Sequence, residues 1–202
     1  MDPLIEGHLR FRAVTWPAER DRYESLAKLG QSPETMVIAC SDSRVDPQTV
    51  FGAIPGELFV VRNVAGLVPP YTPDSGYHGT SAALEFAVRV LKVARIAVLG
   101  HAQCGGVLSM LEGTPGVARD FVEPWMRIAA PALQAVPRQL SRDDRLCACE
   151  MEVVRLSLEN LLTFPWISEA VGAGTLRLQG FRFDIRSGLL TTLVEGRFVQ
   201  VG

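Results

Sequence analysis

Short apolar runs alternate with helix-like segments between residues 34 and 111, and this alternation limits the possible folds more than any other feature. The runs lie within residues 34–40, 58–61 and 96–99, and each has the character of a strand buried on both faces of a sheet. Helices are expected to begin at Asp46-Pro47, to cover 81–93 and to follow Gly105. Strands that alternate with helices form parallel sheets flanked by helices, so we expect an α/β fold with a mostly parallel central sheet.

The two ends of the chain differ from this middle part. In residues 1–33 apolar side chains are scattered among charges, which predicts one or two helices that pack on another surface. Residues 113–140 hold four prolines and are expected to be irregular, and a long helix should cover 147–162. The tail alternates apolar with polar residues between turns, which predicts antiparallel strands at one sheet edge. With 202 residues, the chain is expected to form a single domain, 1–202.

Charge and composition exclude several classes of partner. Lys plus Arg total 20 and Asp plus Glu total 22, so there is no electrostatic reason to expect binding to nucleic acid or to a membrane surface. No apolar run is long enough to span a bilayer, and the N-terminus does not resemble a secretory signal. We therefore expect a cytoplasmic protein whose four cysteines are reduced thiols, metal ligands or catalytic groups.

Three candidate metal ligands follow the predicted buried strands. Cys40 ends the first strand, and His101 and Cys104 come just after the third. Sites in open parallel sheets form outside the carboxyl ends of strands, so these side chains should meet at one edge. Two thiolates and an imidazole suit Zn²⁺, and three protein ligands leave a fourth position open, which is typical of a catalytic site.

Charged residues and glycines beside these ligands complete the candidate site. Asp42 is close enough in sequence to reach the metal, and on an extended loop Arg44 would point the same way and hold the Asp42 carboxylate in a fork. Gly105 and Gly106 begin a predicted helix, where backbone N–H groups could approach an anion.

The order and spacing of these residues resemble the β-class carbonic anhydrases. The similarity covers roughly residues 25–193. Its strongest segments are Cys40-Ser-Asp-Ser-Arg44, Gly56-Glu-Leu-Phe-Val-Val-Arg-Asn63 and Gly100-His-Ala-Gln-Cys-Gly-Gly106. The resemblance implies a mostly parallel sheet and an N-terminal helical arm, residues 1–30, that packs on a partner subunit in a homodimer or homotetramer.

The resemblance also implies an activity and residue roles. Cys40, His101 and Cys104 would bind Zn²⁺, and zinc-bound hydroxide would attack CO2 to give bicarbonate reversibly. Asp42 would accept a hydrogen bond from that hydroxide, or become the fourth ligand in a closed state, and Arg44 would hold it off the metal. The substrate-binding positions implied by the resemblance are Gln31, Phe59, Val64, Phe86 and Gly105.

Some positions depart from the family pattern. Phe86 replaces a frequent Tyr and Gly66 replaces a common Asn. Val37 stands where the bicarbonate-inhibited subgroup has Trp, although Arg62 matches an Arg of the same inhibitory pocket. We therefore expect no high-affinity inhibitory bicarbonate site, and an open zinc site with Asp42 held by Arg44 at neutral pH.

Two other functions remain open at this point. The same fold and metal could serve a hydrolase of carbon disulfide or carbonyl sulfide, or a non-catalytic zinc-binding subunit. Cys147 and Cys149 lie two residues apart on a predicted helix, so we do not expect them to chelate a metal together. His78 is interpreted as a solvated loop residue with proton transfer as the alternative, and Glu85 as either a buried anchor or an exposed helix residue.

Overall fold

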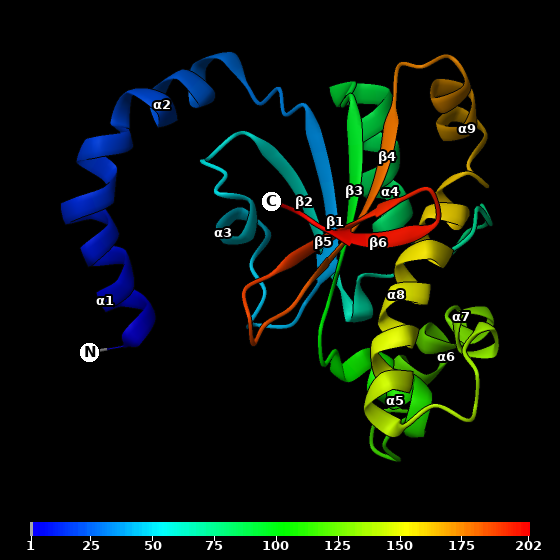
Figure 1. Cartoon of the computed structure of the whole chain (residues 1–202). Coiled ribbons are helices and arrows are strands. Elements are labelled where there is room, and N and C mark those ends of the chain that lie inside the picture. The colour runs from blue at the N-terminus through cyan, green and yellow to red at the C-terminus, as the bar shows by residue number, and fades with distance from the viewer. Residues whose placement is uncertain (1) are drawn as a thin grey trace.

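A computed structural model describes residues 2–202 and contains one six-stranded sheet within that range (Figure 1). Its strands are β1 (Thr35–Cys40), β2 (Leu58–Asn63), β3 (Arg95–His101), β4 (Arg177–Phe183), β5 (Leu190–Val194) and β6 (Arg197–Gln200). They lie in the order β2-β1-β3-β4-β5-β6; the first four are parallel, whereas β5 and β6 continue the sheet in antiparallel pairing. The expected mostly parallel sheet with antiparallel strands at its C-terminal edge is confirmed.

Helices precede the sheet and connect its strands. They are α1 (Pro3–Arg10), α2 (Trp16–Leu29), α3 (Pro47–Phe51), α4 (Gly79–Glu85), α5 (Gly105–Glu112), α6 (Val122–Arg127), α7 (Ala130–Ala135), α8 (Arg142–Leu161) and α9 (Pro165–Gly172). Two π-helical turns, Phe11–Thr15 and Phe86–Leu91, continue α1 and α4, and a 3₁₀ turn covers Val64–Gly66.

Three boundaries differ from the sequence expectation. Helix α8 begins before Cys147, because the Ser141 hydroxyl caps it by accepting the Asp144 N–H at 3.2 Å. Helix α9, which the sequence pattern did not predict, begins at Pro165. The tail segment 177–183 is one strand parallel to β3, because α8 and α9 return the chain to the amino end of the sheet before it starts.

The core lies on both faces of the sheet, which explains the continuous apolar runs. Met36 and Ile38 of β1 pack with Ile96 and with residues of α4, α8 and α9 on one face. Val37 and Ala39 pack on the other face with side chains from α3, β2 and the C-terminal strands. A third cluster, between α5 and α8, contains Cys40 and Cys104 and therefore surrounds the candidate site.

Close packing of α8 on β3 requires a glycine at position 100. A Cβ there would lie 2.6 Å from Cγ2 of Val154. We expect Gly100→Ala to lower the free energy of unfolding of the metal-free protein by about 1–3 kcal/mol, because a well-packed core does not accept an added methyl group. Urea denaturation would measure this. Gly172→Ala is the control, because a Cβ there meets nothing within 4 Å; equal stability of the two variants would contradict the prediction.

The N-terminal helices form an arm, defined here as residues 3–29, that curves away from the sheet (Figure 1). Leu4, Leu9 and Val14 on this arm are exposed. The expected helical arm of residues 1–30 therefore has the predicted helices, although Met1 lies outside the described residues. Among residues 2–202, no helix combines the length and apolar character needed to cross a bilayer.

Candidate metal centre

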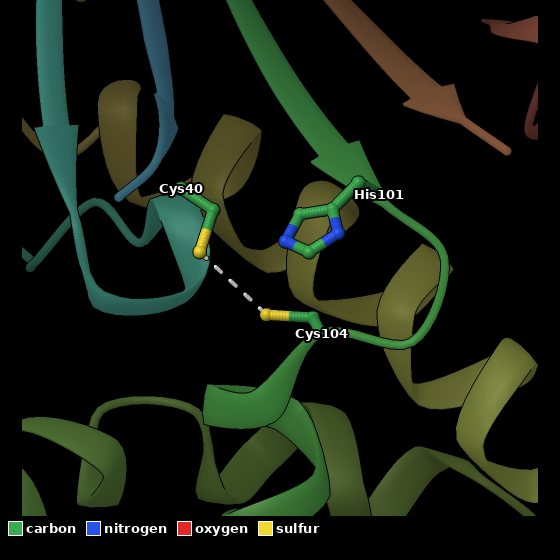
Figure 2. Close-up of side chains that lie close together, drawn as sticks. All are labelled: Cys40, His101 and Cys104. Carbon is green, nitrogen blue, oxygen red and sulfur yellow. Dashed lines mark hydrogen bonds between the residues drawn. The ribbon is translucent and has the colours of Figure 1, made fainter. Parts of the chain in front are cut away.

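The three candidate ligands lie together at the carboxyl edge of the sheet. Cys40 ends β1, His101 ends the adjacent strand β3, and Cys104 directly precedes α5, with all three side chains turned toward one another (Figure 2). The Sγ atoms of Cys40 and Cys104 are 3.8 Å apart, and the three ligand atoms lie within 4.8 Å of one another. The sequence prediction that these residues meet is confirmed.

The donor atoms of this cluster fit a zinc ion. The Nδ1 atom of His101 lies 2.9 Å from the carbonyl oxygen of Ala102, so an Nδ1–H donor leaves Nε2 as a free lone pair. This Nε2 is buried and has no hydrogen-bond partner. The hydrogen bond between the thiols lowers the pKa of Cys40 and raises the pKa of Cys104. An orphaned imidazole nitrogen beside two buried sulfurs is a donor set that a Zn²⁺ ion would satisfy.

Asp42 and Arg44 form an ion pair at the edge of the cluster. Arg44 donates from Nε to Oδ1 of Asp42 at 2.9 Å and from Nη2 to Oδ2 at 2.6 Å. Oδ2 of Asp42 lies 3.9 Å from Nε2 of His101. The expected pairing is present, but the expectation of an extended loop was wrong. The Arg44 N–H also donates to Oδ1 of Asp42 at 3.0 Å, so a local turn brings the two side chains together.

The Arg44 pair should keep Asp42 ionised throughout the neutral range. Its side-chain hydrogen bonds are the main reason that the pKa of Asp42 lies well below its usual value. A depressed folded-state pKa stabilises the fold above the unfolded pKa of about 3.9, and this stabilisation is lost as the pH falls toward the folded value. We expect the unfolding free energies of metal-free wild type and Asp42→Asn to differ by a constant amount above about pH 5 and to converge below about pH 4. Urea titrations from pH 3 to 8 would measure this; convergence between pH 6 and 8 would contradict it.

Arg62 holds the segment that carries Cys40 and Asp42. Its guanidinium donates to the carbonyl oxygens of Cys40, Asp42 and Val45 at 2.9, 2.6 and 2.7 Å. The sequence analysis assigned Arg62 only to a possible inhibitory pocket and missed this role, because the residue lies 22 positions after Cys40 and meets it through strand pairing. Nε and Nη2 of Arg62 are thus engaged with the backbone. The absence of a high-affinity inhibitory bicarbonate site stays a prediction.

Val64 follows Asn63, which pairs with Cys40, and Gly105 follows Cys104; their contact with substrate stays a prediction. Val64 directly follows β2 and is exposed. Gly105 begins α5 in open space, since a Cβ there would meet nothing within 4 Å. Gly106 has a different role, because its Cβ would lie 2.9 Å from Cγ1 of Val64 and 3.0 Å from Cβ of Ala65. Gly106 therefore lets α5 approach the turn after β2.

Gln31, Phe59 and Phe86 lie elsewhere in this chain. Phe59 pairs in register with Met36, which is four residues, or about 13 Å of strand, before Cys40. The rings of Phe59 and Phe86 lie 5.9 Å apart, and Phe86 is exposed. Gln31 is exposed in the segment before β1. A single copy does not bring these three residues to its own ligands, so their predicted contact with substrate stays a prediction that a second copy would have to satisfy.

The remaining candidate residues lie outside the cluster of Cys40, His101 and Cys104. Cys147 and Cys149 lie on α8, half-buried and buried, and outside the metal cluster. Nε2 of His78 lies 2.8 Å from Oδ1 of Asp74. Glu85 is exposed and its carboxylate pairs with Arg89.

Fold and site together define an α/β protein in which two cysteines and one histidine at the carboxyl edge of a parallel sheet could hold a metal ion. A family model for carbonic anhydrase matches residues 35–190. "Beta carbonic anhydrase 5, chloroplastic" of Arabidopsis thaliana is 40% identical over 183 residues, which cover 89% of this chain. The chain belongs to the β-carbonic anhydrase family. It spans 60% of the length of that Arabidopsis relative.

Solved structures of the family have the same fold. The β-carbonic anhydrase CcaA has a TM-score of 0.90 and 31% identity, covering 98% of this chain and 91% of its own. A structure reported among two tetrameric β-carbonic anhydrases of Sordaria macrospora has a TM-score of 0.79 and 27% identity, covering 98% of this chain and 95% of its own.

Proposed function

We propose that this protein interconverts CO2 and bicarbonate with a Zn²⁺ ion held by Cys40, His101 and Cys104. The observation that carries the proposal is the arrangement of Asp42: its carboxylate lies at the edge of the ligand cluster but is held in the fork of Arg44. A purely structural zinc site would close its fourth position with a protein ligand. A carboxylate retained beside three ligands favours a catalytic site over the non-catalytic alternative.

Each residue of the candidate site has a separate role in the proposed reaction. Zinc, when bound, would lower the pKa of a water molecule to about 7 and so supply a nucleophile at neutral pH. Asp42 accepts a hydrogen bond and orients the attacking group, while Arg44 keeps the carboxylate ionised and in place. Exposed Val64 provides apolar surface for CO2, and the N–H of Gly105, at the start of α5, provides a donor for the bicarbonate anion. Both thiols must be reduced to bind zinc, which supports a cytoplasmic location.

We propose further that the active form is a homodimer or a homotetramer. Two observations support it: the arm exposes apolar side chains, and Gln31, Phe59 and Phe86 lie away from the ligands of their own chain. A second copy whose Phe59–Phe86 surface faced the metal centre would supply the apolar wall that a single copy lacks. Tetramers are described for the Sordaria macrospora relatives.

The arm gives a direct test of the assembly. We expect the full chain to sediment as a multiple of 22.0 kDa, and a chain lacking residues 2–29 to shift toward the monomer. The physical reason is the loss of exposed apolar side chains such as Leu4 and Leu9, which need a second surface. Analytical ultracentrifugation at micromolar concentration measures both. A full chain that sediments at 22.0 kDa would contradict the proposal.

Stopped-flow hydration of CO2 tests the activity itself. The zinc-loaded protein is assayed at about pH 8.5, above the expected pKa of about 7 for the nucleophile. Zinc-dependent hydration is the expected result. One zinc per chain without hydration above the buffer rate would overturn the proposal, and hydrolysis of carbon disulfide or carbonyl sulfide by the same sample would then identify the hydrolase alternative.

A further inference from the structure

One peptide bond beside the metal centre is held at both of its ends. The carbonyl oxygen of Gln103 accepts a hydrogen bond from Nη2 of Arg44 at 3.1 Å. The N–H of Cys104, which belongs to the same peptide unit, donates to Oε1 of Glu150 at 3.4 Å. The orientation of this peptide determines where the Cys104 side chain starts, so both contacts bear on the position of a zinc ligand.

The backbone at this peptide is held in an uncommon conformation. Gln103 has a φ of +55°, in the left-handed region that residues other than glycine rarely adopt. Such a conformation persists only where the surrounding structure holds it in place. The hydrogen bonds to Arg44 and Glu150 are the contacts that hold it here.

Glu150 is a buried carboxylate with no other assigned function. It lies on α8 and is only 2% exposed. Arg182 of β4 donates from Nε and Nη2 to Oε2 of Glu150 at 3.0 and 2.8 Å. This leaves Oε1 free for the Cys104 N–H. A buried carboxylate is costly unless it is paired, and the fork of Arg182 supplies that pair.

We propose that Glu150 is a positioning residue that fixes the zinc ligand Cys104 through the Gln103–Cys104 peptide. This inference rests on the proposed zinc function and extends it. The same peptide connects two ion pairs, Asp42–Arg44 on its carbonyl side and Glu150–Arg182 on its N–H side. Loss of either ion pair would therefore disturb the Gln103–Cys104 peptide, which carries the zinc ligand and is also held by the other pair.

Glutamine is the informative substitution, because it keeps the size of the side chain. A carboxylate has two acceptor oxygens, one for Arg182 and one for the Cys104 N–H, whereas an amide has a single acceptor oxygen. In Glu150→Gln the single amide oxygen can serve either Arg182 or the Cys104 N–H. The NH2 group then faces the other of these two donors and cannot accept from it. We expect the peptide to lose its fixed orientation even where the fold is kept.

The test measures zinc affinity by competition with a chromophoric chelator, together with the thiolate-to-metal absorption of the cobalt(II)-substituted protein. Glu150→Gln is expected to weaken zinc binding by about 10- to 100-fold, the usual effect of losing a partner behind a metal ligand, and to change the cobalt spectrum. The control is Glu159→Gln, the same substitution at an exposed position of α8; it should bind zinc within about twofold of wild type, because Glu159 lies outside the ligand cluster.

Several results would overturn the inference. Wild-type zinc affinity and an unchanged cobalt spectrum in Glu150→Gln would do so, even if its metal-free form melted at a lower temperature, because that pattern indicates a structural role only. If Glu150→Gln does not fold, Arg182→Lys replaces the fork by a single charged group and should still weaken zinc binding measurably; unchanged affinity would count against the inference. A wild-type chain that bound zinc but did not hydrate CO2 would contradict the proposed function and leave the affinity comparison valid.

Discussion

Cys104→Ser is expected to abolish stoichiometric zinc binding and to lower the rate of CO2 hydration by more than about 100-fold. Substitution of residues behind a ligand usually costs 10- to 100-fold in metal affinity or activity, so loss of a ligand itself should cost more. A serine hydroxyl is a poor replacement, because it does not ionise near neutral pH and lacks the soft sulfur that Zn²⁺ prefers. The cluster would retain only Cys40 and His101.

Zinc content per chain and stopped-flow hydration measure this expectation together. Cys147→Ser is the matched control, because that thiol is half-buried on α8 and lies outside the ligand cluster. The control should keep one zinc per chain and wild-type activity. Full zinc occupancy in Cys104→Ser, or an equal loss in the two variants, would show that Cys104 is not a ligand.

Arg44→Ala is expected to lower CO2 hydration by about 10- to 100-fold while zinc remains bound. Without the fork, the Asp42 carboxylate has lost both of its side-chain donors and lies 3.9 Å from Nε2 of His101, beside the ligand atoms. A free carboxylate in that place is a natural fourth ligand for Zn²⁺ and would close the site. Arg44 also anchors the Gln103 carbonyl, so the ligand loop loses one of its two supports.

The cobalt(II) spectrum separates a closed site from a merely weakened one. In wild type the visible absorption should change with pH around neutrality, whereas in Arg44→Ala it should be independent of pH. Arg44→Lys is the control: it keeps the charge but cannot form the fork, and its activity should lie between those of wild type and Arg44→Ala. Wild-type activity in Arg44→Ala would show that the pair is not required.

The sequence predicted that distant residues would meet in those cases where adjacent parallel strands end beside each other. Cys40 and His101 end two strands, and parallel strands present their carboxyl ends at one edge whatever the details of packing. The strands themselves were predictable from continuous apolar runs, because a strand that is buried on both faces has few polar residues. The motif around Asp42 and Arg44 predicted their pairing, although not the turn that produces it.

The amino-acid sequence by itself therefore determined the strand–helix alternation, the set of candidate metal ligands and the Asp42–Arg44 pair. Only the tertiary structure decided which side chains support them. Glu150 meets Arg182, 32 residues away, and the Cys104 N–H, 46 residues away, because α8 packs on β3 and β4. The tertiary structure also placed Phe59 at the other end of the sheet from the ligands. The physical reason is that a side chain's partners depend on register and helix packing, which are set by contacts between distant segments rather than by local pattern.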